Sequence, residues 1–507
     1  MFNNACVLIL QKIDKAELKA LKAFVKRRVP VQNQEFILFD YLCRCHPEFK
    51  PKDLAPEKIA ELFKDKSWSN PAKRLSSIGN ELTRLLEEYL VEQALKKNWD
   101  EYDFLLAYEY SRLGLPDLLD RKIDNYLQAP EKINASGKKE VTKENGQTPE
   151  NDQAGQDQKK ETSRGGISVW HHWNLYRMYH LRYYSRDTVK TAPGEKNLDL
   201  SWEHLEHAYL AAKLRIALEM GTLKSINGKI PSVTFSDVEL TTLKARMTEK
   251  DIFLYLYCHA YDLMAHPSDE KFHHLKLQLL KLGKHLSKDE QGNLLTPLIN
   301  YASTAIRKGQ GQFYAEASFL HHYGLDTGVL LQDGKITPEL LLNVINLTCE
   351  AQELSKATAL LEKWTPSLPA SLQEEALVAL KGRIEFHSKK YMAAAGQFFS
   401  IKRFSNHLME LVARTSTVQS YYELKEYEVL SSFCINFAKT LSRSEDRFSQ
   451  HYRDSYGNFV KMVQALISAK RDQHTSLTEK QFKLQKKIAK QSALVCKNWL
   501  MKQIKVL

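Results

Sequence analysis

Three pairs of adjacent histidines are the side chains in this sequence best suited by type to bind a metal ion. They are His171–His172, His273–His274 and His321–His322. Two consecutive side chains on a helix point about 100° apart, so such a pair cannot share one ion without a loop. The sequence CRCH at Cys43–His46 lacks the second ligand pair that a zinc site of this kind needs. We therefore expect no metal site and no cofactor.

A phosphate-binding loop is the second chemistry that the sequence suggests. The consensus G-x-x-x-x-G-K-[ST] has a near match in GVLLQDGKIT, which begins at Gly328. Gly334 comes one residue too late, and Ile336 stands where a hydroxyl must bind magnesium. We expect instead a turn, followed by a helix that starts at Thr337-Pro338. The motifs G-x-S-x-G, H-E-x-x-H and G-x-G-x-x-G are absent. The sequence favours a protein that is not an enzyme, although it leaves open a catalytic site assembled from distant residues.

Positive charge is concentrated at two places in the chain. The formal net charge is +12, and residues 469–507 carry ten Lys or Arg against Asp472 and Glu479, a local balance of +8. A second concentration lies at Lys22–Arg28. Such charge is typical of a surface for nucleic acid or for an acidic partner, but also of the solvated face of an amphipathic helix, which we favour. The residues of the predicted basic patch are Lys26, Arg27, Arg28, Lys483, Lys486, Lys490 and Lys497.

An aromatic segment, WHHWNLYRMYHLRYYSR, occupies residues 170–186. Trp173, Tyr176, His180 and Tyr183 recur at three- and four-residue intervals, which places them on one helical face. Aromatic rings with interleaved arginines resemble a surface that stacks the bases of single-stranded nucleic acid. Because aromatic residues at helical spacing are more often part of a core, we expect this face to be packed inside the protein.

The N-terminal region could form a helix-turn-helix reader of DNA. Its third long helix, predicted to start at Asn70-Pro71, carries Lys73, Arg74 and Arg84. The alternative is that the apolar stripe of the same helix packs on the preceding helices. That stripe consists of Leu75, Ile78, Leu82, Leu85 and Leu86. The sequence continues as helix where wing strands would be expected, so we favour packing.

Composition predicts that helices position all of these residues. The chain has 507 residues, of which 20 are Gly and 15 Pro, so turn-forming residues are few. The hydrophobic fraction of 43% is enough for a sizeable core, and the length suggests about three domains or a repeat array. We therefore expect an all-α protein.

Cysteine content and hydropathy indicate the compartment. Seven scattered cysteines do not form a disulfide framework, which favours a reducing environment. The apolar run ACVLIL is too short for a signal peptide, and no run approaches the ~18 apolar residues of a membrane span. We expect a cytoplasmic protein with no membrane contact.

One segment divides the chain. Residues 129–167 are rich in Lys, Glu, Gln, Gly and Asn, and almost no apolar residue follows Ile133. Such a segment cannot bury enough surface to offset the entropy of ordering it, so we expect a flexible, disordered polar linker. The predicted domains are an N-terminal helical domain at 1–128 and a helical-repeat domain with a basic C-terminal helix at 168–507.

The C-terminal half carries a helical-repeat pattern. In tetratricopeptide-like helix pairs, a bulky residue opens the second helix, a small residue three positions later lets the helices approach, and a large one fills the gap. The residues with these roles are Leu354, Ala357 and Leu361 in one unit, Tyr391, Ala394 and Phe398 with Gly382 on the first helix in the next, and Tyr427 in a third. The opening residues are 37 and 36 residues apart, close to the ~34-residue repeat.

The order of these segments resembles a known family. The stretch from NYASTAIRKG to ATALLEKW, then YMAAAGQFF, YYELKEYEVLSSF and the terminal NWLMKQI, together with IDKAELKALKAFV near the N-terminus, is similar to uncharacterised tetratricopeptide-like proteins of the Bacteroidetes lineage. The resemblance covers nearly all of the chain outside residues 129–166, where the long polar insertion departs from it. It implies a bacterial, cytoplasmic helical solenoid and assigns no functional residue.

The sequence as a whole predicts an α-solenoid of stacked antiparallel helix pairs, a tetratricopeptide-like superhelix. Its expected function is that of a non-catalytic scaffold that binds a protein or peptide partner on its surface. The alternative is association with nucleic acid through the basic N-terminal helices and the Lys-rich C-terminal helix. The sequence names neither the partner nor the oligomeric state.

Overall fold

The computed structural model describes residues 4–63, 71–128, 167–185, 194–227, 234–247, 251–332, 334–401, 404–443, 448–474, 476–491 and 493–507. Within these ranges the regular elements are all helices, and an isolated β-bridge joins Gln332 to Lys335. The all-α prediction is therefore confirmed for this part of the chain. The chain divides into two compact units, Met1–Ala208 and Tyr209–Leu507.

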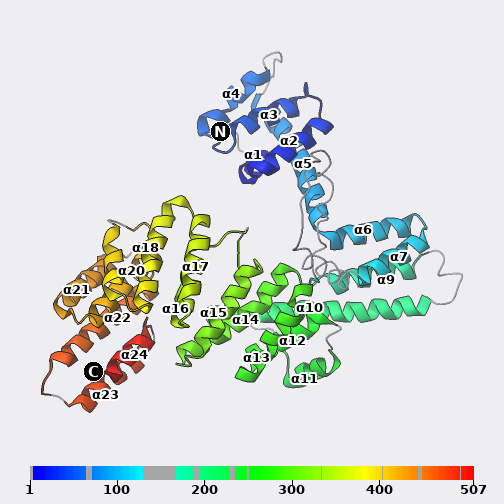
Figure 1. Ribbon diagram of the computed structural model, residues 1–507. Coiled ribbons are helices and arrows are strands. Elements are labelled where there is room, and N and C mark those ends of the chain that lie inside the picture. The colour runs from blue at the N-terminus through cyan, green and yellow to red at the C-terminus, as the bar shows by residue number, and fades with distance from the viewer. Residues whose placement is uncertain are drawn as a thin grey trace, which may run out of the picture. The chain divides into compact units, whose positions relative to one another are not determined.

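Unit 1 (Met1–Ala208) is built from helices of different lengths around two separate cores. Its helices are α1 (Ala5–Lys12), α2 (Lys15–Arg28), α3 (Gln34–Cys45), α4 (Pro56–Ala60), α5 (Pro71–Lys97), α6 (Trp99–Arg112), α7 (Pro116–Leu127), α9 (His171–Tyr183) and the first part of α10 (Gly194–Asn227). Two 3-10 turns, Pro51–Leu54 and Glu61–Phe63, flank α4. Figure 1 shows the long helix α5 leading from the N-terminal cluster of helices to α6.

The first core of unit 1 joins α1 to α5 and contains the apolar stripe of α5. Leu75, Ile78, Leu82 and Leu86 are at most 1% exposed and pack in one cluster with side chains of α1, α2 and α3. The apolar stripe predicted from the sequence therefore packs on the preceding helices, as expected. Asp14 caps α2, because its carboxylate accepts the backbone N–H of Glu17 at 2.8 Å.

The second core of unit 1 lies between α6, α7 and α9. Phe104 and Ala107 of α6 and Leu119 of α7 pack against Leu175 and Met178 of α9. Helix α9 follows the predicted polar linker in sequence but belongs to the same compact unit as the helices that precede it. Residues 129–166 lie outside the described part of the chain, so the predicted boundaries at 128 and 167 stay a prediction.

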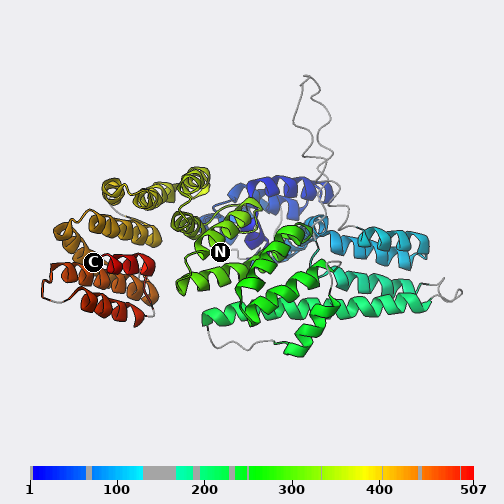
Figure 2. The same cartoon turned by 60° about the horizontal axis from the view of Figure 1, so that its bottom comes forward.

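Unit 2 (Tyr209–Leu507) contains the rest of α10 and all later helices. These are α11 (Asp237–Arg246), α12 (Ile252–Ala265), α13 (Asp269–Leu282), α14 (Lys288–Arg307), α15 (Phe313–Asp326), α16 (Pro338–Glu350), α17 (Leu354–Trp364), α18 (Ala370–His387), α19 (Tyr391–Gln397), α20 (His407–Glu423), α21 (Tyr427–Arg443), α22 (Gln450–Arg471), α23 (Leu477–Ala489) and α24 (Lys497–Lys505). Three 3-10 turns, Gly283–His285, Thr365–Ser367 and Phe398–Ser400, follow α13, α17 and α19. Figure 2 shows these helices from a second side.

The three predicted opening residues each start a helix. Leu354, Tyr391 and Tyr427 are the first residues of α17, α19 and α21. Two positions before each of them stands a residue in the left-handed region, with φ of 60° to 64°. These left-handed residues are Gln352, Lys389 and Lys425. In each turn, the backbone N–H of the residue after the left-handed one donates to the carbonyl oxygen five residues earlier, at 2.9 to 3.0 Å. The three connections therefore have one geometry.

Close packing within the α18–α19 pair depends on two small residues. Ala394 of α19 is 1% exposed. A Cβ atom added to Gly382 of α18 would lie 3.5 Å from the carbonyl oxygen of Ala394 and 3.4 Å from Cβ of Gln397. The two helices therefore approach each other at the position that the repeat spacing predicts. The first helices α16, α18 and α20 also contact one another in sequence order.

The basic C-terminal segment, expected to be one helix, is interrupted. Helix α23 ends at Ala489, α24 begins at Lys497, and Cys496 between them has a φ of 53°. The residues in the gap are ordinary helix formers, so tertiary contacts and not local propensity separate the two helices. One such contact is the hydrogen bond from Nδ2 of Asn458 in α22 to the carbonyl oxygen of Ala493, at 2.9 Å.

Among the described residues, no helix is both long enough and apolar enough to cross a membrane.

Candidate functional site

A cavity of about 430 Å³ in unit 2 is the first candidate site, and we call it the Arg383 cavity. Alternate helices α14, α16, α18, α20 and α22 each contribute to its wall. Representative side chains from these helices are Arg307, Asn346, Arg383, Thr415 and Tyr456. The lining is completed by Tyr314 of α15, by Gln491 and by the segment Leu494–Trp499, which leads into α24. The first helices of successive pairs thus present their side chains to one shared space.

Arg383 is held rigidly in this wall. Its guanidinium donates to Oδ1 of Asn346 at 3.1 Å, to Oε1 of Gln419 at 2.8 Å and to Oε1 of Glu350 at 2.7 Å. These three acceptors belong to α16 and α20, on either side of α18. The arginine is 6% exposed, and a charge in this position requires such partners to offset its desolvation. The network fixes the spacing of three helices around the cavity.

Charge in the cavity wall is predominantly positive. Arg307, Arg383 and Lys497 line it together with one carboxylate, that of Glu350. Arg307 and Lys497 are exposed, so they are accessible from solvent. A group that carries a carboxylate or another negative charge is therefore favoured in this space.

The chain's own C-terminal segment is anchored at the cavity. Nδ2 of Asn498 donates to the hydroxyl oxygen of Tyr314 at 2.9 Å, which joins residues 184 positions apart. Nε1 of Trp499 donates to Oε1 of Glu423 in α20 at 2.9 Å. Burial raises the pKa of Tyr314 to about 12, so its hydroxyl stays protonated at neutral pH. The segment from Leu494 to Trp499 is thus part of the site's wall.

Most repeat residues predicted from the sequence lie in the interfaces of helix pairs. Ala357, Leu361 and Ala394 are buried, and Leu354 and Phe398 pack against the same apolar cluster at partial burial. Gly382 makes the close approach described above. Tyr391 and Tyr427 are half-buried, with rings 5.7 Å from Phe386 and 5.8 Å from Tyr422, respectively. None of these predicted residues is among those that line the Arg383 cavity. Helix α18 contributes to the lining through Arg383, a position that the repeat pattern does not include.

The predicted basic patch is distributed over the two units. Lys26, Arg27 and Arg28 are exposed at the end of α2 in unit 1, where Arg28 pairs with Glu88 at 2.6 Å and Glu92 at 3.3 Å. Lys483 and Lys486 are exposed on α23, Lys490 follows its end, and Lys497 begins α24, all in unit 2. Lys483 pairs with Glu479 at 2.5 Å. Because a turn separates α23 from α24, Lys497 does not continue the stripe of the other three.

The aromatic segment is less buried than we expected. Trp173 is 41% exposed, and Tyr176, His180 and Tyr183 are only partly buried, so the core face of α9 is a different one. That face consists of Asn174, Leu175, Met178 and Tyr179. The interleaved arginines are engaged inside unit 1: Arg177 with the Phe104 ring and Glu101, and Arg182 with Asp120. Arg186 lies outside the described residues.

A cluster of three histidines in unit 1 is a second candidate site, which the sequence did not predict. His172 of α9 lies beside His204 and His207 of α10, and one ligand nitrogen from each lies within 4.8 Å of the others. The cluster takes one histidine from the adjacent pair His171–His172 and two from α10. The available signal was instead the i, i+3 spacing of His204 and His207, which places both on one face of α10.

The other histidine pairs have separate surroundings. Nδ1 of His321 contacts the carbonyl oxygen of Ala317 at 2.7 Å, while Nε2 of His322 lies 3.2 Å from Oγ1 of Thr348. The near match to a phosphate loop is a turn, as expected: Gly328 and Gly334 both have a φ of 74°, and α16 follows with Thr337 as its N-cap.

Comparisons with known protein families, with curated proteins and with solved structures find no match to this chain. The resemblance to a tetratricopeptide-like bacterial family therefore stays a prediction, and the site must be interpreted from its own residues.

Proposed function

We propose that unit 2 is an α-solenoid of stacked helix pairs and that it works as a non-catalytic scaffold that binds a protein or peptide. The observation that carries the proposal is the Arg383 cavity, to which alternate helices from α14 to α22 contribute in turn. In helical-repeat proteins, the first helices of successive pairs form a continuous binding surface. The repeated turn geometry at Gln352, Lys389 and Lys425 supports the same architecture.

The charge of the cavity suggests the chemistry of the ligand. Arg307 and Lys497 are exposed at the wall, and the buried Arg383 adds a third positive charge against Glu350. We infer that the ligand is a peptide segment that places a carboxylate in the cavity. Arginine and lysine at such a position select for charge by favouring the acidic ligand and disfavouring a basic one.

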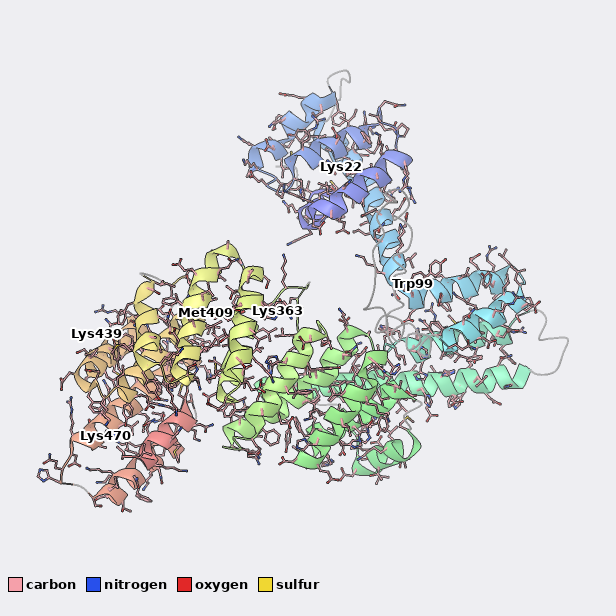
Figure 3. The ribbon with its side chains drawn as sticks, viewed as in Figure 1. Lys22, Trp99, Lys363, Met409, Lys439 and Lys470 are labelled. Atoms are coloured by element: carbon pink, nitrogen blue, oxygen red, sulfur yellow. The ribbon has the colours of Figure 1, made fainter. Side chains whose placement is uncertain are left out.

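Selection from a random peptide display library by the purified full-length protein tests this proposal. We expect enriched peptides to carry Asp, Glu or a free C-terminal carboxylate, and their binding to fall at least tenfold in a double variant, Arg307→Glu with Lys497→Glu. Lys439→Glu with Lys470→Glu is a matched control of equal charge change, because both are exposed lysines, of α21 and α22, that do not line the cavity (Figure 3). No enrichment, or equal binding by the double variant, would contradict the proposal.

Association with nucleic acid is the second candidate function, and its support is weaker. Arg28, Arg177 and Arg182 are engaged in ion pairs inside unit 1, and Lys483 in one on α23. Retention on DNA that weakens steeply between low and moderate salt would favour this alternative. Salt-insensitive capture of a peptide would favour the scaffold.

A further inference from the structure

Three imidazole rings from two helices converge in unit 1. Nδ1 of His172 in α9 lies 3.0 Å from Nδ1 of His204 in α10, and their ring centroids are 5.3 Å apart. The His172 ring also lies 5.0 Å from that of His207, centroid to centroid. All three side chains are partly buried, so they are partly shielded from water yet accessible to a small solute.

The distances suit a transition-metal ion. Zinc binds imidazole nitrogen at about 2.0–2.1 Å in tetrahedral geometry, which places two ligand nitrogens about 3.3 Å apart. His172 and His204 already have nearly this spacing, and the largest separation in the cluster is 4.8 Å. A modest rotation of one side chain therefore brings all three nitrogens to a common ion. His204 and His207 are fixed relative to each other because they occupy one face of α10.

Aromatic packing orients one ring of the cluster. The ring of Tyr179 stacks on that of His204, with centroids 5.5 Å apart and planes inclined by 9°. This stacking restrains the His204 ring in one orientation. Imidazoles that the protein holds in place bind a divalent cation more tightly than free ones do.

We propose that His172, His204 and His207 form a binding site for a divalent first-row transition-metal ion, with zinc as the reference ion. Three imidazole nitrogens hold the ion, and a water molecule completes a four-coordinate shell. The ion joins α9 to α10 through one ligand from α9 and two from α10. The site goes beyond the proposed scaffold function, because all three ligands lie in unit 1 and the Arg383 cavity lies in unit 2.

A hydrogen-bonded histidine pair is the alternative explanation of the same geometry. An N–H···N bond between His172 and His204 would account for their distance of 3.0 Å. It would not require His207, and it would be unaffected by metal. The two explanations therefore predict different results for His207 variants.

Titration of the chelator-treated full-length protein with Co²⁺, followed by competition with Zn²⁺, distinguishes them. We expect one equivalent of Co²⁺ to give the intense visible ligand-field bands of a four-coordinate site, and Zn²⁺ to abolish them. His204→Gln and His207→Gln should each weaken Co²⁺ binding by more than about tenfold, since loss of an outer-shell partner alone costs about 10- to 100-fold. His180→Gln is the matched control: it changes a histidine of α9 outside the cluster and should leave binding unchanged.

The test remains valid if a variant fails to fold, because the titration of the wild-type protein can contradict the proposal by itself. Absence of a four-coordinate Co²⁺ spectrum in the wild-type protein overturns the proposal. A spectrum that persists in His204→Gln and His207→Gln, with circular dichroism unchanged, would place the ion elsewhere and overturn it as well. The scaffold proposal is independent of either result, since its test uses variants of unit 2.

Discussion

Burial keeps the side chain of His387, beside the Arg383 cavity, in its neutral form. Burial, the charge of Arg383 and that of Lys502 lower its pKa from 6.5 to about 2. Nε2 of His387 lies 3.7 Å from Oε1 of Glu350, a distance that would suit an ion pair if the imidazole were protonated. Because burial and the positive charges of Arg383 and Lys502 disfavour the protonated form, the imidazole stays neutral and the pair is not ionic.

This neutral histidine predicts a dependence of stability on pH. The unfolded chain binds a proton at His387 below about pH 6.5, and the folded chain does not until about pH 2, so acid favours unfolding in between. We expect His387 to contribute a loss of up to about 1.4 kcal/mol in unfolding free energy per pH unit below 6.5. The comparison of wild type with His387→Gln by urea denaturation at pH 7.5, 6.0 and 5.0 measures it. Identical slopes in the two proteins would mean that the folded histidine titrates normally.

For single residues, the sequence shows which side chains could bind a ligand by type, but it does not show which of them lie next to one another in the fold. Histidine spacing excluded an ion shared by neighbours on one helix, and nothing local indicated that His172 would face His204 across two helices. Arg383 carried no sequence signal either, since an arginine on an amphipathic helix is usually solvated. Its burial depends on Asn346 and Gln419, which lie 37 and 36 positions away.

Among elements, the α18–α19 pair is the clearest case of a geometry set by small residues. Ala394 is 1% exposed, and its carbonyl oxygen would lie 3.5 Å from a Cβ atom added to Gly382, so α18 and α19 are in close contact here. Ala394→Leu should lower the unfolding free energy by about 1–3 kcal/mol through overpacking. Ala393→Leu is the matched control, because Ala393 is the exposed neighbour on the same helix and should change stability by less than about 0.5 kcal/mol. Equal midpoints of denaturation for the two variants would contradict the helix register.

The beginnings of the helices could be predicted, and one interruption could not. Leu354, Tyr391 and Tyr427 were expected to open helices because bulky residues recur at even spacing, and the structure confirms each start. The gap between α23 and α24 has no Gly or Pro to mark it. It arises from long-range contacts such as Asn458 with Ala493 and Asn498 with Tyr314, which no local propensity encodes.

Over the whole molecule, the seven cysteines are all free thiols. Cys6, Cys43, Cys258, Cys349 and Cys434 are buried, and burial raises the pKa of each to about 12. Cys45 and Cys496 are partly buried, and burial raises their pKa as well. Since the thiolate is the reactive form, the folded protein should react slowly.

Thiol titration checks this arrangement of both units at once. We expect a disulfide reagent such as DTNB at pH 8 to label at most two thiols per folded chain, and slowly, and all seven in concentrated guanidinium chloride. Rapid labelling of more than two thiols in the folded protein would show that at least one core is more open than described. Lack of a seventh reactive thiol after unfolding would indicate a modified or paired cysteine.

Helices on both sides of the polar stretch share one core, which composition alone does not indicate. A polar stretch at residues 129–166 indicates a break in sequence, but Leu175 and Met178 of α9 complete a core that begins with Phe104 of α6. Composition reports where a chain cannot bury surface, and packing decides which helices share a core.

The left-handed residues Gln352, Lys389 and Lys425 have a consequence for the length of the chain. The three turns share a left-handed residue and the same backbone hydrogen bond, at intervals of 37 and 36 residues. We therefore expect the removal or insertion of one whole interval to rejoin the chain through a turn of the same kind. A change of any other size would leave one helix without its neighbour.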